Sequence, residues 1–174
     1  MSIKHGLLAL LSSGPQYGYQ LRADFEQRTG STWPLNAGQV YTTLGRLERD
    51  GLVESRSQDA EGHVFYALAA PGRQELDQWL SRPVDRSPPP RDELAIKLAL
   101  VAQMPDVDAL GILRAQRTAT LSTLQTLTRR KASALDSGDV GVLVVVDALV
   151  ASAEAEARFL DTCERRLLDR KADR

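Results

Sequence analysis

Residues 36–51 read NAGQVYTTLGRLERDG, and this stretch decides the fold. Asn36 is a good N-cap for a helix, and Gln39 three residues later can reach back to it as in a capping box. The apolar positions of the stretch fall on one helical face, formed by Val40, Leu44 and Leu47. The pattern predicts one capped helix from Ala37 to about Asp50 that ends at Gly51.

The opposite face of this helix is small and polar, because each residue turns the helix by 100°. It carries Gly38, Gln39, Thr42, Gly45, Arg46 and Arg49. Such a face can approach the floor of a DNA groove closely and still donate hydrogen bonds. Arginine suits guanine or phosphate, glutamine can read adenine, and threonine can bond a phosphate or pack on a thymine methyl. The alternatives are solvated arginines and a glutamine that only caps the helix.

Two shorter helices are predicted ahead of this one. The first covers about residues 2–11 and stops at Ser12-Ser13-Gly14-Pro15, a strong helix breaker. The second starts near Gln16 or Tyr17 and runs to about Thr29, with Gly30 as its C-cap. Its predicted inward face is Tyr17, Leu21 and Phe25.

A β-hairpin is predicted after the capped helix. Residues 52–57 and 63–68 alternate in the manner of strands and are joined by a polar loop that closes with Gly62. A further helix follows Pro71-Gly72, over about residues 73–81. Helix, helix, capped helix and hairpin is the order of a winged helix-turn-helix, whose recognition helix lies in the major groove of DNA. The hairpin tip can reach the phosphates or the adjacent minor groove, and Arg56 and His63 are its basic side chains.

The remaining chain reads as helix almost throughout. Four prolines between residues 82 and 90 predict a stiff connector. Helices are then expected over residues 94–101, from after Asp106, and over about 142–168, and the last two carry long apolar seams. Two such helices joined by a short loop cannot bury their seams on each other alone, so we expect a dimer.

The predicted fold is therefore mainly α with a small β-hairpin wing. The predicted domains are a winged helix-turn-helix DNA-binding domain over residues 1–82, a Pro-rich linker over 83–90, and a helical dimerisation domain over 91–174.

Composition excludes several classes of protein. Hydrophobic residues make up 43% of the chain and charged residues 26%, as in a soluble globular protein. No apolar run approaches the roughly 20 residues of a membrane span. Without a recognisable export signal, and with the single Cys163, we expect a cytoplasmic location. The net charge of the chain is −1, so the total charge does not indicate DNA binding. The indication comes from the direction in which the arginine side chains point.

An enzyme finds little support in the sequence. His5 and His63 are far apart, and there is no metal-spaced cluster, Gly-rich phosphate loop or Gly-x-Ser-x-Gly turn. We expect no catalytic residue, no metal and no cofactor. A protein-interaction module that uses the winged helix to bind a partner stays open as an alternative. Salt separates the two, because phosphate-driven DNA binding weakens steeply as salt rises.

Several strings resemble PadR-family transcriptional regulators. Residues 14–21, GPQYGYQL, resemble the family's opening pattern, and residues 38–53, GQVYTTLGRLERDGLV, look like its recognition helix. Phe65–Leu68 and Gly72-Arg73 fit the end of the wing and the start of the next helix. Residues 92–98, DELAIKL, are similar to the opening of the virulence-activator-type α-helical C-terminal domain.

The resemblance implies a DNA-binding homodimer, usually a repressor, that acts on a palindromic operator in double-stranded DNA. It also implies release, in some members, by a small aromatic or drug-like effector, and phosphate contacts for Tyr19 and Tyr41, which could otherwise be core aromatics. The residues expected to contact DNA are Tyr19, Gln39, Tyr41, Thr42, Arg46, Arg49, Arg56 and His63. The sequence departs from the family where Tyr17 replaces a histidine, Thr42 a proline and Ala69 a threonine, and where Asp59 and Glu61 make the wing tip acidic.

Overall fold

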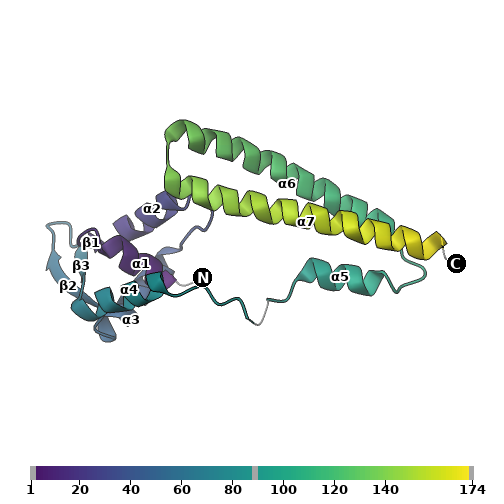
Figure 1. The fold of residues 1–174 in the computed structure, drawn as a ribbon. Helices are drawn as coiled ribbons and strands as arrows, with labels where there is room; N and C mark the ends of the chain where they lie inside the picture. The colour runs from purple at the N-terminus through teal and green to yellow at the C-terminus, as the bar shows by residue number, and fades with distance from the viewer. Residues whose placement is uncertain (1–2, 88–89, 173–174) are drawn as a thin grey trace. The chain divides into compact units, whose positions relative to one another are not determined.

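The chain folds into two compact units that part between Asp85 and Arg86. The structure is a computed structural model and describes residues 3–87 and 90–172 (Figure 1). The predicted class, mainly α with a small β-hairpin wing, is confirmed, and the sheet has three strands. The elements of the first unit are α1 (Ile3–Leu11), β1 (Gln16–Tyr17), α2 (Gly18–Arg28), α3 (Ala37–Arg49), β2 (Val53–Gln58), β3 (Val64–Leu68) and α4 (Ala70–Ser81). Those of the second are α5 (Glu93–Val101), α6 (Ala109–Ser137) and α7 (Val140–Ala172).

The core of the first unit gathers aliphatic side chains from its four helices and from the sheet. Its fully buried members are Leu7, Leu8, Leu21, Val40, Leu44, Leu47, Val53 and Leu76. Helix α3 is capped as predicted, because Asn36 Oδ1 accepts the Gln39 N–H at 3.1 Å and Gln39 Oε1 accepts the Asn36 N–H at 3.2 Å. Since the apolar face of α3 is buried in this core, its polar face is turned to solvent.

The sheet is antiparallel in the order β1-β3-β2. The predicted hairpin is confirmed as β2 and β3, with a register irregularity between Ser55 and Ser57. The expected start of the second helix at residue 16 or 17 is wrong. Gln16 pairs with Tyr66 and Tyr17 with Phe65, so the backbone is extended there and α2 begins at Gly18.

Helix α4 begins at Ala70, three residues before the predicted start. Pro71 lies in its first turn, where the missing N–H has no intrahelical partner to lose. Gly72 is required by a close approach, since a Cβ there would clash with the carbonyl oxygen of Leu52. The Pro-Gly pair therefore opens this helix instead of preceding it.

In the second unit, α6 and α7 form an antiparallel helical hairpin (Figure 1). Gly138 ends α6 with a positive φ of 70°, and Asp139 Oδ1 accepts the Val142 N–H at 3.0 Å, so α7 begins slightly before the predicted residue 142. Leu98 of α5 packs with Leu113 of α6 and Leu160 of α7.

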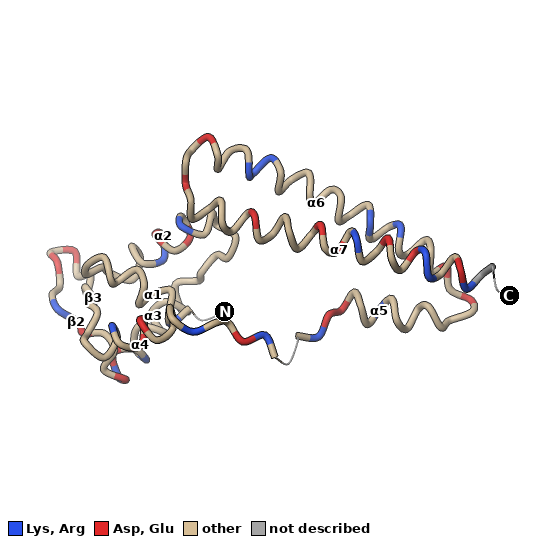
Figure 2. The backbone as a smooth tube through the Cα atoms, viewed as in Figure 1, with Lys and Arg blue, Asp and Glu red and all other residues tan. Residues whose placement is uncertain are grey.

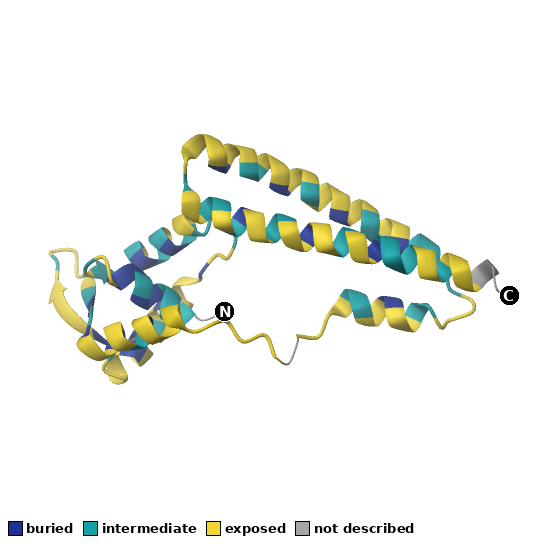
Figure 3. Ribbon diagram, in the orientation of Figure 1, coloured by how far each residue is buried: buried dark blue, intermediate teal, exposed yellow. Residues whose placement is uncertain are grey.

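The facing sides of α6 and α7 are buried and their outer sides are exposed (Figure 3). Asp147, an acid within an apolar run, is exposed and pairs with Lys131 across the two helices at 2.6 Å. No helix in the described part of the chain is long and apolar enough to cross a membrane.

Candidate nucleic-acid interface

The polar face of α3 is exposed along its whole length. Gly38, Gln39, Thr42, Gly45, Arg46 and Arg49 are all exposed. Burial of Val40, Leu44 and Leu47 on the opposite side fixes this orientation. The structure thus exposes the side chains that the sequence predicts to face DNA.

Gln39 is held by the cap of α3. Its Oε1 accepts the Asn36 N–H, which leaves its amide NH2 group without a partner among the described residues. The capping role is therefore real, and it leaves two N–H donors for a base. Thr43 donates its hydroxyl to the Gln39 carbonyl at 2.7 Å, whereas the hydroxyl of Thr42 bonds no other group in the described chain.

The two arginines of α3 differ in their surroundings. Arg49 donates from Nε and Nη2 to Asp50 Oδ1, both at 3.0 Å, and this ion pair is exposed. Arg46 has no acceptor within the described residues. Arg46 can therefore bind a nucleic acid without breaking an existing contact, and Arg49 cannot.

Tyr41 lies against the first turn of α2. A Cβ on Gly18 would lie 2.6 Å from Cε1 of Tyr41 and 3.0 Å from its hydroxyl oxygen, so only glycine lets the ring come this close. Tyr41 and Tyr19, in the same turn of α2, are 52% and 64% exposed, so neither is a core aromatic. Helix N-termini bind phosphate through their free N–H groups, and two tyrosine hydroxyls beside one suit the same ligand.

The wing lies beside this turn. The His63 ring stacks on Tyr17 with a centroid distance of 4.5 Å, and Tyr17 also meets Phe65 edge-on. Because Tyr17 immediately precedes α2, these contacts hold the end of the hairpin loop, at His63, against the start of α2. Arg56 lies within β2, outside the hairpin loop, and its side chain is exposed.

The tip of the wing is acidic (Figure 2). Asp59 Oδ1 accepts the His63 N–H at 2.7 Å, and Asp59 Oδ2 lies 2.9 Å from His63 Nδ1. Burial works against ionisation of Asp59, but these hydrogen bonds from His63 outweigh it and hold the pKa of the carboxyl below its ordinary value. His63 is thus committed to Asp59 on one side of its ring, and the tip offers DNA less positive charge than its histidine suggests.

Asp59, Glu61 and His63 also have potential ligand atoms within 4.8 Å of one another. The alternating Asp-x-Glu-x-His spacing in the hairpin loop is the signal for this group, and sequence reasoning did not single it out. Exposed acidic groups commonly gather in this way without an ion, so the cluster identifies no metal centre.

Sequence reasoning also missed Arg73 and Gly18. Arg73 follows the Pro-Gly pair of α4 and lines the same pocket as Arg56, although 17 residues separate them. Gly18 matters only because Tyr41 packs over it. The positions of Arg73 and Gly18 matter because of contacts between different elements. No local sequence pattern predicts such contacts.

Helix α2, helix α3 and the β2–β3 hairpin together define a winged helix-turn-helix protein, a class that places an exposed helix in the major groove. Residues 7–78 match the transcriptional regulator PadR-like family, and residues 90–167 match the virulence activator alpha C-terminal domain. The chain therefore belongs to the PadR-like family of transcriptional regulators, and it is a DNA-binding regulator, not an enzyme.

Two curated relatives are similar to the chain. The probable transcriptional regulator Rv1176c of Mycobacterium tuberculosis is 27% identical over 98% of this chain and 100% of its own length. The negative transcriptional regulator PadR of Bacillus subtilis is 28% identical over 71% of each chain.

Solved structures of Bacillus subtilis PadR share the fold. The complex of that protein with operator DNA has a TM-score of 0.76 and 21% identity, and covers 95% of this chain and 98% of that one. Its complex with p-coumaric acid has a TM-score of 0.74 and 23% identity, with the same coverage.

Proposed function

We propose that this regulator is a repressor that binds a palindromic operator as a homodimer. The observation that carries the proposal is the exposed polar face of α3, with Arg46 unpaired and the start of α2 and the wing beside it. Each subunit places α3 in one major groove, where Gln39, Thr42 and Arg46 face the bases. Repression is favoured by the similar Bacillus subtilis protein, which is a negative regulator.

The remaining contacts position the protein on the duplex. Tyr19 and Tyr41 bind a backbone phosphate beside the first turn of α2. Arg49 reaches a phosphate after it releases Asp50. Arg56 and His63 approach the backbone from the wing, where the acid at the tip weakens their attraction.

The dimer forms through the domain at residues 91–174, and residues 83–90 join it to the DNA-binding domain at residues 1–82. The second unit exposes large apolar side chains that its own helices leave uncovered: Ile96, Leu100, Leu121, Leu135, Val140, Val144, Phe159 and Leu168. A surface of this kind on a small helical unit favours association with a second copy.

A small aromatic effector releases the protein from its operator. The similar Bacillus subtilis protein binds p-coumaric acid, which supports an effector of this class. By linkage, an effector that binds better to the DNA-free form weakens DNA binding by the same factor by which DNA weakens effector binding.

A titration of the purified chain into labelled duplexes from the upstream region of its own gene tests the proposal, with scrambled duplex as control at three salt concentrations. Selective binding that falls steeply with salt is expected. Equal binding of both duplexes would call for a genome-fragment selection. If that selection also recovers no sequence, the winged helix serves a protein partner, a function that its acidic wing tip would suit.

A further inference from the structure

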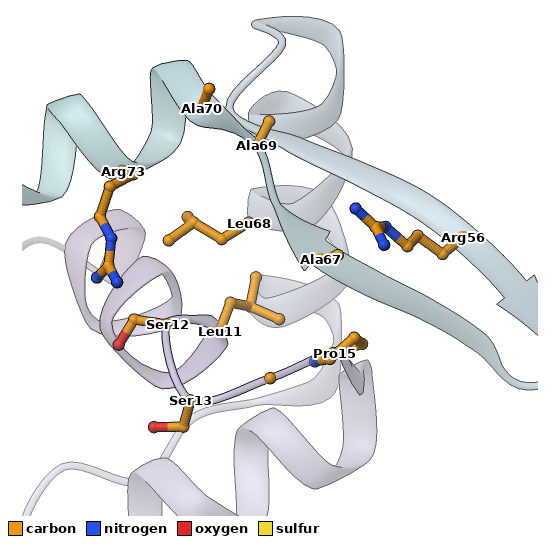
Figure 4. Close-up of a pocket in the computed structure, with 11 residues that line it drawn as sticks. Leu11, Ser12, Ser13, Pro15, Arg56, Ala67, Leu68, Ala69, Ala70 and Arg73 are labelled. Atoms are coloured by element: carbon orange, nitrogen blue, oxygen red, sulfur yellow. The ribbon is translucent and has the colours of Figure 1, made fainter.

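A pocket of about 390 Å³ lies on the first unit, with the core side chain Leu11 in its lining (Figure 4). The loop after α1 forms one wall, the end of β3 and the start of α4 form another, and β2 contributes Arg56. It is lined by Leu11, Ser12, Ser13, Gly14, Pro15, Arg56, Ala67, Leu68, Ala69, Ala70 and Arg73. Neither the proposed DNA-binding face of α3 nor the proposed dimer surface uses this pocket as a whole.

The pocket is positive in a protein that is slightly negative overall. None of its eleven lining residues is acidic, and two are arginines from different elements. Arg56 extends from β2 toward Ala67, and Arg73 extends from α4 toward Ser12 (Figure 4). Neither arginine pairs with a carboxylate among the described residues, in contrast to Arg22, Arg49, Arg114, Arg117 and Arg158.

Most of the other donors in the pocket are already occupied, which leaves the two arginines as its main donors. The N–H groups of Ser13 and Gly14 already bond carbonyls of α1, and Ser12 gives its hydroxyl to Ala9 O at 2.7 Å. The Ser13 hydroxyl has no partner in the described chain. The two guanidinium groups lie on opposite sides of the pocket (Figure 4), and both side chains are exposed and unpaired in the described chain, so they can turn inward onto one ligand. A phosphate suits this pair, because it accepts from several donors at once and binds arginine in a bidentate manner.

We propose that this pocket binds a phosphate group between Arg56 and Arg73. The phosphate belongs either to the DNA backbone or to a free phosphorylated small molecule. The first source rests on the proposed function and makes Arg73 a further DNA contact. The second makes the pocket a ligand site that is independent of DNA.

The first experiment titrates inorganic phosphate into the full chain at constant ionic strength and follows binding by calorimetry. Saturable binding of one phosphate per chain is expected, and Arg56→Gln and Arg73→Gln should each weaken it by about tenfold. Arg28→Gln is the matched control, because Arg28 is exposed on the same unit, lies outside the pocket and loses the same charge. Thermal unfolding of each variant checks that the fold is kept.

The second experiment measures DNA binding of the same variants in phosphate-free buffer. If the DNA backbone is the source, Arg73→Gln weakens specific and scrambled duplexes equally and lowers the salt slope by about one. If the source is a free phosphate, Arg73→Gln leaves DNA affinity as it is in Arg28→Gln, while phosphate binding is lost. Failure of both pocket variants to differ from Arg28→Gln in either experiment overturns the proposal. A wild type that binds no DNA refutes the proposed function alone, since the phosphate titration still decides the pocket.

Discussion

In the proposed complex, Arg46 is the residue on which sequence-specific binding by α3 depends most. Its guanidinium is exposed and unpaired in the described chain, whereas Arg49 is held by Asp50 at 3.0 Å. We expect Arg46→Ala to weaken operator binding by about 1–3 kcal/mol, the usual cost of a lost bidentate base contact. Arg49→Ala should cost less than about 1 kcal/mol, because its gain on DNA is offset by the loss of its exposed ion pair. Fluorescence titration of both variants measures the difference.

The scrambled duplex identifies the group that Arg46 binds. A base contact lowers the affinity for the operator and leaves the affinity for scrambled DNA nearly unchanged. Equal losses on both duplexes would make Arg46 a phosphate contact. Unchanged affinity on both would remove it from the interface.

Gly18 places Tyr41 beside the first turn of α2. In Gly18→Ala the new Cβ would meet the Tyr41 ring at 2.6 Å, and the half-exposed ring can swing outward at little cost to stability. We expect an almost unchanged melting temperature and a loss of DNA affinity of about three- to tenfold, equal on operator and scrambled duplexes. Tyr41→Phe, which keeps the ring and removes the hydroxyl, should show a similar loss. Full affinity in Gly18→Ala would mean that Tyr41 need not lie against α2.

At this scale the sequence predicts the exposed face of α3 well and the contacts around it poorly. The 100° rotation and the burial of Val40, Leu44 and Leu47 determine which side chains point outward. The pairing of Arg49 with Asp50 and the approach of Arg73 to the pocket of Arg56 are set by rotamers and by the close packing of the start of α4 against Leu52 and Leu68. Helical periodicity carries no information on either.

Glu75 is the electrostatic link between α1 and α4. It accepts from Lys4 Nζ at 2.7 Å and lies 3.0 Å from His5 Nε2. The hydrogen bond from Lys4, and after it the one from His5, holds the pKa of Glu75 below its ordinary value of 4.5. A carboxyl whose pKa is lowered by folding stabilises the protein above its unfolded-state pKa, and this contribution disappears as the pH falls through the lower folded-state pKa.

We therefore expect Glu75→Gln to lower the free energy of unfolding of the first unit at pH 7 by up to about 1 kcal/mol. The gap between wild type and variant should persist down to about pH 4.5 and close below it. Urea unfolding followed by tryptophan fluorescence measures it, because Trp33 and Trp79 both lie in the first unit. Asp77→Asn, an exposed change of the same charge on α4, is the control. A gap that is constant down to pH 3 would show that the ion pair contributes nothing.

Two element boundaries moved for reasons that lie outside the elements themselves. Tyr17 continues the helical spacing of Leu21 and Phe25, yet its backbone pairs with Phe65 and its ring stacks on His63. The start of α4 follows Ala69, whose N–H donates to the Leu52 carbonyl at 3.1 Å, a contact between segments 17 residues apart. Periodicity and capping residues set the centres of these helices, and strand pairing and close packing set their ends.

In the proposed complex, DNA binding depends on dimerisation through the second unit. The exposed apolar side chains on the outer sides of α5, α6 and α7 are consistent with association of two copies through the second unit. The seam of leucines in the sequence predicts that such surfaces exist. It cannot set the distance between two recognition helices, which depends on how two copies meet, and therefore the spacing of operator half-sites has to be measured.

A twofold dimer places its two α3 helices on one side of the duplex, so half-sites should lie about 34–36 Å apart, one helical turn, or a multiple of it. Insertion of 5 bp between the half-sites turns the second one to the opposite side, and the affinity should fall to that of a single half-site. Insertion of a full turn returns the second half-site to the same side of the duplex but places it farther from the first. The affinity should therefore recover only as far as the connector between the two units can extend over the added distance. Light scattering on each complex counts the bound chains. Two chains, one dimer, are expected on the native operator, and the same dimer held through one half-site is expected on the 5 bp variant, whereas equal affinity for all three spacings would mean that each chain binds its half-site independently.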